Sequence, residues 1–131
     1  MANITALYAG LCGVLVIALA FRVVQFRRSG KVGLGTGGDP DNEVRVRAHA
    51  NAVEYIPLAL ILMLVAELGG LSAFWLHIFG GVFVLARLVH AFGFTASGGG
   101  YHPGRFWGTA LSWVVILVLA AIDIGLAVKN L

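Results

Sequence analysis

The chain begins with a run of 21 residues, Met1 to Phe21, that contains no charged side chain. A helix needs about 20 apolar residues to cross ~30 Å of hydrocarbon, so this run predicts a membrane-spanning helix. A signal peptide is the alternative interpretation. However, no Lys or Arg precedes the run, and basic residues follow it from Arg22 onward, which is the reverse of the order in a signal peptide. We therefore expect a retained helix.

Glycine clusters divide the rest of the chain into three more apolar segments. Residues 29–42 are Gly-rich and contain Pro40, so they predict a loop. Gly69 and Gly70 predict a tight turn, and residues 97–100 predict a second loop. Each remaining segment is long enough to cross a membrane.

These segments predict an all-α fold, an integral membrane four-helix bundle that forms a single domain over residues 1–131. The expected helices cover residues 3–28, 42–68, 71–96 and 104–128. We expect Asp41 or Asn42 to cap the second helix. Composition agrees, because only 11% of residues are charged, against ~25% in a typical soluble domain. This excludes an ordinary cytosolic enzyme and a nucleic-acid module, and the one cysteine excludes an internal disulfide.

The basic residues gather at one end of the expected bundle. The loops after the first and third helices, with their flanks, contain Arg22, Arg27, Arg28, Lys31, Arg45, Arg47 and Arg105. The opposite end has only Lys129. The positive-inside rule then makes both basic loops cytoplasmic. We expect a bacterial inner membrane location, with both termini periplasmic and the functional site facing the cytoplasm.

Several polar side chains are predicted to lie within the membrane. Arg47, Asn51 and Glu54 share one face of the second helix, because their spacing is i, i+4, i+7. Counting ~1.5 Å per residue from the tight turn places Arg87 and His90 of the third helix at a similar depth. Ionisable groups are expensive in hydrocarbon, so such a layer predicts either a functional site or a buried ion pair.

Two interpretations of this polar layer stay open. The excess of arginine favours a pocket for an anionic ligand, because a guanidinium matches a carboxylate. Arg105, which starts the fourth helix, and Arg27 and Arg28, which end the first, would border that pocket. Alternatively, Glu54 and Arg87 neutralise each other in a structural or transport bundle. No metal site is expected, because the histidines lack ligand spacing.

Three features are expected near the opposite end of the bundle. Tyr8 is expected in an aromatic belt at the membrane surface, and His77 is expected as a polar tip at that interface. The Gly80–Gly81 pair predicts a place where a neighbouring helix approaches closely.

The stretch Arg47-Ala48-His49-Ala50-Asn51-Ala52-Val53-Glu54-Tyr55-Ile56-Pro57 resembles the R-A-x-x-N-x-x-E-x-x-P signature of the MAPEG family. These are membrane-associated proteins of eicosanoid and glutathione metabolism. The resemblance covers the whole chain, with Arg-x-x-His on the third helix and Pro-x-Arg before the fourth. It implies a homotrimer of four-helix bundles, with glutathione bound between subunits near the cytoplasmic side.

The resemblance also implies roles for individual residues. Arg105, with Arg28 as a second candidate, would stabilise the glutathione thiolate and act catalytically. The implied glutathione-binding residues are Arg47, His49, Asn51, Glu54, Tyr55, His90 and Arg27. Phe94 and Phe106 depart from the family pattern, because the eicosanoid enzymes have tyrosine and the prostaglandin enzyme serine there.

The implied function is that of a membrane-bound glutathione transferase, with glutathione peroxidase as an additional activity. Glutathione would be a cosubstrate, conjugated to a lipophilic electrophile. The expected partners are glutathione, a lipophilic electrophile or lipid, membrane lipids and other copies of the chain, but no nucleic acid. A non-enzymatic membrane protein that binds lipid or glutathione is the alternative.

Overall fold

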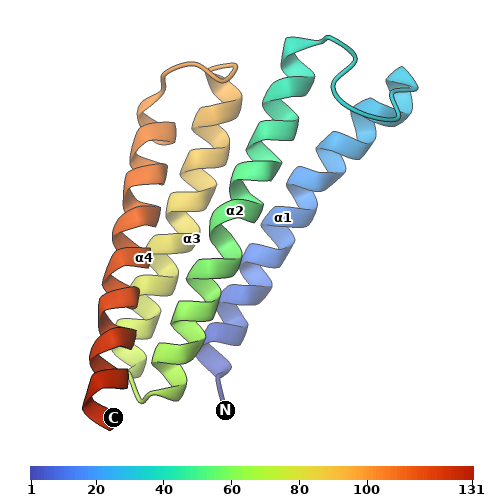
Figure 1. Cartoon of the computed structure of the whole chain (residues 1–131). Coiled ribbons are helices and arrows are strands. Elements are labelled where there is room, and N and C mark those ends of the chain that lie inside the picture. The colour runs from blue at the N-terminus through green and yellow to red at the C-terminus, as the bar shows by residue number, and fades with distance from the viewer.

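The computed structural model describes residues 1–131 and contains four α-helices. The helices are α1 (Asn3–Gly30), α2 (Pro40–Leu68), α3 (Ala73–Ala96) and α4 (Pro103–Asn130). They run alternately up and down, and both termini lie at the same end of the bundle as the α2–α3 turn (Figure 1). Helices α2 and α3 each contact all three other helices. The predicted all-α four-helix bundle is therefore confirmed.

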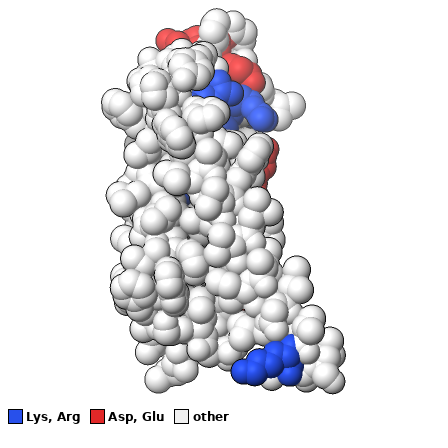
Figure 2. All heavy atoms as spheres, turned by 90° about the vertical axis from the view of Figure 1, so that its left-hand side faces the viewer, with Lys and Arg blue, Asp and Glu red and all other residues white.

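The surface of the bundle is apolar over most of its length. Each helix is long and apolar enough to cross a membrane. Only 24 of the 131 residues are buried within the chain, while large side chains such as Phe92 and Leu117 are 70% and 69% exposed. Charged side chains gather at the ends of the α4 side, and a broad, almost uncharged band separates them (Figure 2). Hydrocarbon is the solvent that suits such a surface.

The start of α2 differs from the expectation. Asp39 is the N-cap, since its side chain accepts a hydrogen bond from the Asp41 backbone N–H at 2.9 Å. The prediction that Asp41 or Asn42 caps this helix was wrong. Pro40 explains the difference, because proline has no N–H to satisfy and suits the first helical position. The helix therefore begins two residues before the expected residue 42.

A carboxylate of α2 holds the first turn of α1 at the end of the bundle where the termini lie. The Glu67 carboxylate of α2 accepts hydrogen bonds from the backbone N–H groups of Ile4 and Thr5, at 3.0 and 2.7 Å. These N–H groups belong to the first turn of α1, where no helical partner exists. Glu67 thus caps a helix far from it in sequence, a role that the sequence pattern did not indicate.

Tyr8 of α1 packs against α3 rather than facing a membrane surface. Its side chain is 9% exposed, and its hydroxyl lies 3.0 Å from Nδ1 of His77. The Tyr8 ring fits against Gly80, where an added Cβ would come within 2.3 Å of it. The close approach at Gly80 is therefore confirmed, whereas the placing of Tyr8 in an aromatic belt was wrong. His77 remains exposed but has a buried partner.

Candidate functional site

Arg87 of α3 is the centre of a buried polar cluster and is only 1% exposed. Its guanidinium donates hydrogen bonds to Oδ1 of Asn51 at 2.5 Å and to Oγ of Ser112 at 3.4 Å. It also lies 3.3 Å from Nδ1 of His90 and 5.6 Å from the centre of the Tyr55 ring. One arginine thus connects α2, α3 and α4 at a single level. The count of helical rise predicted this level for Asn51, Arg87 and His90, but not the contact with α4.

Glu54 does not take part in this cluster as a direct partner. The side chains that Arg87 contacts by hydrogen bonding are those of Asn51, His90 and Ser112. Glu54 is exposed on the surface of α2. The interpretation of Glu54 and Arg87 as a buried, mutually neutralising pair therefore lacks a contact to support it. The terminal nitrogens of Arg87 contact neutral groups, its buried Nε has no hydrogen-bond partner, and the Glu54 carboxylate is exposed.

Ser112 joins the cluster through a local feature of α4 that the sequence analysis missed. Its side chain is fully buried, and its hydroxyl donates to the Gly108 carbonyl at 2.7 Å. Gly108 allows the approach of α3, because an added Cβ there would lie 2.6 Å from the Ala86 carbonyl oxygen. A glycine one turn before a serine was the available signal, since small residues mark close helix contacts in membranes.

Arg105 occupies the first turn of α4 and is held by the loop before it. Its guanidinium donates hydrogen bonds to the carbonyls of Gly99 and Gly100, the latter at 3.0 Å. It also lies 4.5 Å from the centre of the Phe94 ring. Phe94 in turn stacks on His90, with 5.7 Å between the ring centres. Aromatic rings therefore link Arg105 to the Arg87 cluster.

A polar hollow of about 370 Å³ opens between the start of α2 and the α3–α4 loop. Its charged lining residues are Glu43, Arg47 and Arg105, and Phe94 contributes an aromatic wall. Arg47 and Arg105 come from different helices and face the same space. The structure thus brings together two of the predicted site residues, and the volume lies within the range of small-ligand pockets.

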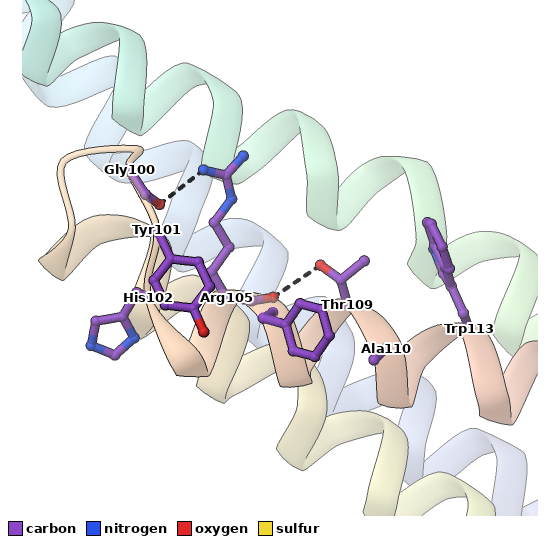
Figure 3. A pocket seen from close by; sticks show the side chains of 8 residues that line it. Gly100, Tyr101, His102, Arg105, Thr109, Ala110 and Trp113 are labelled. Carbon is purple, nitrogen blue, oxygen red and sulfur yellow. Dashed lines mark hydrogen bonds between the residues drawn. The ribbon is translucent and has the colours of Figure 1, made fainter.

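An aromatic hollow of about 590 Å³ adjoins the polar hollow on the outer side of α4. Its lining includes Tyr101, Phe106 and Trp113. In Figure 3, the Arg105 side chain reaches from α4 toward α2, while Trp113 lies two turns further along α4. Arg105 lines both hollows, so it stands at the boundary between a charged space and an aromatic one.

The remaining predicted site residues lie outside these two hollows. Arg27 donates a hydrogen bond to the Gly35 carbonyl at 3.4 Å, and Arg28 is exposed in the last turn of α1. Helix α1 leans away from α2 toward the C-terminal end of α1 (Figure 1). His49 is half-buried on α2. Neither these arginines nor His49 line the hollows beside Arg105 in a single chain.

Comparison with known proteins identifies one matching family and two relatives of similar length. The sequence profile of the MAPEG family matches residues 5–124. The inner membrane protein YecN of Escherichia coli strain K12 is 36% identical over 119 residues, which cover 88% of this chain and 86% of the relative. YecN of Escherichia coli O6:H1 strain CFT073 matches to the same extent.

Proposed function

The chain belongs to the MAPEG family, and from this premise we propose that it is a membrane-bound glutathione transferase that conjugates glutathione to lipophilic electrophiles. The observation that carries the proposal is the position of Arg105, which lines both the polar and the aromatic hollow. A transferase must bring a charged thiol donor and an apolar acceptor to one point. Arg105 is located where two such spaces adjoin.

The polar hollow suits the charges of glutathione. The tripeptide carries two carboxylates, an ammonium and a thiol. Arg47 offers a guanidinium for a carboxylate, while Glu43 in the hollow and the accessible Glu54 are candidates for the ammonium. Asn51 accepts from Arg87 through its Oδ1, which leaves its amide N–H groups free to donate to the ligand. We also assign Tyr55 and His90, which lie against Arg87 in this cluster, to glutathione binding.

Arg105 is the proposed catalytic residue. The thiolate, rather than the thiol, is the nucleophile, and a free cysteine thiol has a pKa near ~8.5. A guanidinium beside the sulfur favours the charged form and so lowers that pKa. With an aromatic halide, the thiolate attacks the carbon that bears the halogen, a C–S bond forms, and halide leaves. The thiol proton is released to water.

A peroxidase reaction would use the same thiolate. Attack of the thiolate on a hydroperoxide oxygen breaks the O–O bond and leaves the sulfenic acid of glutathione, while the departing alkoxide takes a proton from water and leaves as an alcohol. A second glutathione then reduces the sulfenic acid to the disulfide and releases water. This activity requires no residue beyond those that hold and activate the thiol.

The proposed assembly is a homotrimer in an inner membrane, with the site on the cytoplasmic side and both termini periplasmic. YecN, which this chain resembles, is named as an inner membrane protein. A trimer also gives a role to residues outside the hollows, because Arg27, Arg28 and His49 of one subunit are then available to a neighbour's site. We assign Arg28 to thiolate stabilisation and the other two to glutathione binding in this way.

A non-enzymatic binding protein is the second candidate, and two side chains favour it. Phe94 and Phe106 border the hollows but carry no hydroxyl to donate to a sulfur or a carboxylate. In that case glutathione or a lipid would bind without being converted. The loss of these hydroxyls does not remove the guanidinium of Arg105, which is why the transferase is the first proposal.

The proposed function is tested with the purified full-length protein in detergent micelles. The assay follows conjugation of glutathione to 1-chloro-2,4-dinitrobenzene as a function of pH. Arg105→Ala is expected to lower kcat/KM by about 100-fold and to move the apparent pKa of the bound thiol back toward ~8.5. Arg105→Lys should restore part of the rate, and Lys129→Ala, at the opposite end, should not change it.

Calorimetric titration with glutathione separates the two candidates. Binding without conjugation of any electrophile would favour the binding protein. An absence of glutathione binding, or a rate that Arg105→Ala leaves unchanged, would contradict the transferase proposal.

A further inference from the structure

A second polar space lies on the other side of α2 from the site described above. This α1 crevice, of about 210 Å³, is lined by Arg22 of α1, by Asp41, Val44 and Arg45 of α2, and by Thr95 and Gly98. It opens at the end where α1 leans away from α2 (Figure 1). It shares only Val44 and Gly98 with the polar hollow, so neither of its arginines belongs to the proposed glutathione site.

The α1 crevice carries a positive charge that is held in place. The Arg22 guanidinium donates a hydrogen bond to Oγ1 of Thr95 at 3.0 Å, which ties α1 to α3. Arg45 lines the same space from α2, and Asp41 contributes one carboxylate. Two guanidiniums against one carboxylate leave a net charge of about +1. The chemistry therefore fits an oxyanion with several acceptor oxygens, for which guanidinium groups are suited.

The level of the crevice in the bundle is that of a membrane surface. Asp41 is in the first turn of α2, and Thr95 is in the last turn of α3. Helix α1 continues from Arg22 toward the middle of the bundle with exposed apolar side chains. Leu11, Leu15 and Ala18 share the helix face of Arg22, since they precede it by 11, 7 and 4 residues; Leu11 and Ala18 are exposed and Leu15 is half-buried. A charged space thus adjoins an apolar stripe along one helix.

We propose that the α1 crevice binds the phosphate group of a glycerophospholipid, whose acyl chains lie along the apolar stripe of α1. Arg22 and Arg45 bind the phosphate oxygens, and Asp41 faces the hydroxyl or ammonium group of the headgroup. Basic pockets between membrane helices on the cytoplasmic side bind phosphorylated headgroups for the same electrostatic reason. The apolar stripe is what selects a lipid over a free phosphate ion.

The experiment compares three probes on delipidated, full-length protein by native mass spectrometry: dioleoyl-phosphatidylglycerol, dioleoylglycerol and inorganic phosphate. We expect retention of phosphatidylglycerol and little retention of dioleoylglycerol, which lacks the phosphate. Arg45→Gln should weaken phosphatidylglycerol binding about fivefold, and Arg22→Gln with Arg45→Gln about 25-fold. Lys129→Gln, which removes a cation from the opposite end, should leave the affinity unchanged.

The variants are chosen so that a folding defect cannot imitate the result. Arg45 is only half-buried, so Arg45→Gln alone should leave the fold intact. Arg22→Lys keeps the charge, and it should retain most of the phosphatidylglycerol affinity. Each variant should bind glutathione as the unmodified protein does, so this proposal and the transferase proposal fail independently.

Three results would overturn the proposal. Equal retention of phosphatidylglycerol and dioleoylglycerol would show that the phosphate is not recognised. Unchanged phosphatidylglycerol affinity in the double variant would exclude the α1 crevice as its site. Saturation by inorganic phosphate that phosphatidylglycerol cannot displace would assign the crevice to a soluble anion.

Discussion

The guanidinium carbon of Arg105 lies 4.5 Å from the centre of the Phe94 ring, and the same ring stacks on His90 at 5.7 Å. Phe94 is 8% exposed, so its buried ring shields one side of each contact from water. A phenyl ring attracts a cation over its face through its quadrupole. Phe94, which departs from the tyrosine of the eicosanoid enzymes, therefore positions the cation that the proposed reaction requires.

Replacing Phe94 should disturb Arg105 more than it disturbs the fold. Phe94→Leu keeps an apolar side chain but removes the cation–π contact, worth about 1 kcal/mol. We expect kcat/KM for conjugation of 1-chloro-2,4-dinitrobenzene to fall about fivefold, while the KM for glutathione changes less. Steady-state kinetics at several glutathione concentrations measure both quantities. Phe94→Tyr retains the ring face and is the matched control.

An unchanged kcat/KM in Phe94→Leu would show that the carbonyls of Gly99 and Gly100 are sufficient to hold Arg105. A large loss in Phe94→Tyr would show instead that the added hydroxyl, rather than the ring, disturbs the site.

Arg87 should contribute strongly to stability. Its side chain is buried and donates to Asn51 and Ser112, so Arg87→Met would leave Oδ1 of Asn51 without its donor and remove the hydrogen bond that Ser112 accepts. We expect the free energy of unfolding to fall by about 3 kcal/mol. Titration with sodium dodecyl sulfate in mixed micelles, followed by circular dichroism, measures this change. A loss below about 0.5 kcal/mol would mean that water or lipid replaces these partners.

Glu54 should behave in the opposite way. Because it is exposed and is not a hydrogen-bond partner of Arg87, Glu54→Gln should change the free energy of unfolding by less than about 0.5 kcal/mol. The same substitution should weaken glutathione binding about tenfold, since a charge-assisted contact to the ammonium is lost. Calorimetric titration and the unfolding assay together test this. Destabilisation with unchanged glutathione affinity would restore the interpretation of Glu54 as a structural residue.

The sequence predicted the helices and the level of the buried cluster for simple physical reasons. An uncharged run of sufficient length has few alternatives to a spanning helix. Two helices joined by a tight turn must place residues at equal distances from that turn side by side, which is why Asn51 meets Arg87. Helix ends were less predictable. Three candidate caps lie together in Asp39, Asp41 and Asn42, and only the position of Pro40 distinguishes them.

Contacts that depend on packing between helices could not be predicted from one sequence. Ser112 is unremarkable in an apolar helix until Arg87 is placed opposite it. The positions of Arg27 and Arg28, in the last turn of α1, depend on the tilt of that helix. No local sequence pattern determines a helix tilt. The hydrogen bonds from Arg105 to the carbonyls of the α3–α4 loop depend on the conformation of that loop, in which Gly99 takes a positive φ of 85°.

Glu67 should govern the order of the first turn of α1. Its carboxylate accepts from the N–H groups of Ile4 and Thr5, and Glu67→Ala leaves these donors without a partner. We expect a loss of about 1 kcal/mol, as for other helix caps, and faster hydrogen exchange confined to the first turn. Exchange mass spectrometry of the N-terminal peptide measures it. Equal exchange in the two proteins would show that solvent satisfies these groups.

The contact between α3 and α4 should depend on the absence of a side chain at residue 108. A Cβ added to Gly108 would lie 2.6 Å from both the Ala86 carbonyl oxygen and the His90 Cβ, so Gly108→Ala forces the helices apart. We expect destabilisation by about 2 kcal/mol, the cost of overpacking a close contact. Gly125→Ala, on the same helix, is the matched control, since an added Cβ there meets nothing within 4 Å.

The Gly125→Ala control separates the close contact from helix propensity. Alanine favours a helix over glycine by up to about 1 kcal/mol, so Gly125→Ala should be neutral or stabilising. If Gly108→Ala is also stabilising in the detergent unfolding assay, the two helices have room to move apart. In that case the hydrogen bond from Arg87 to Ser112, which spans the same contact, should lengthen without loss of the fold. If Gly108→Ala destabilises and Gly125→Ala does not, the close approach at Gly108 is what holds Ser112 against Arg87.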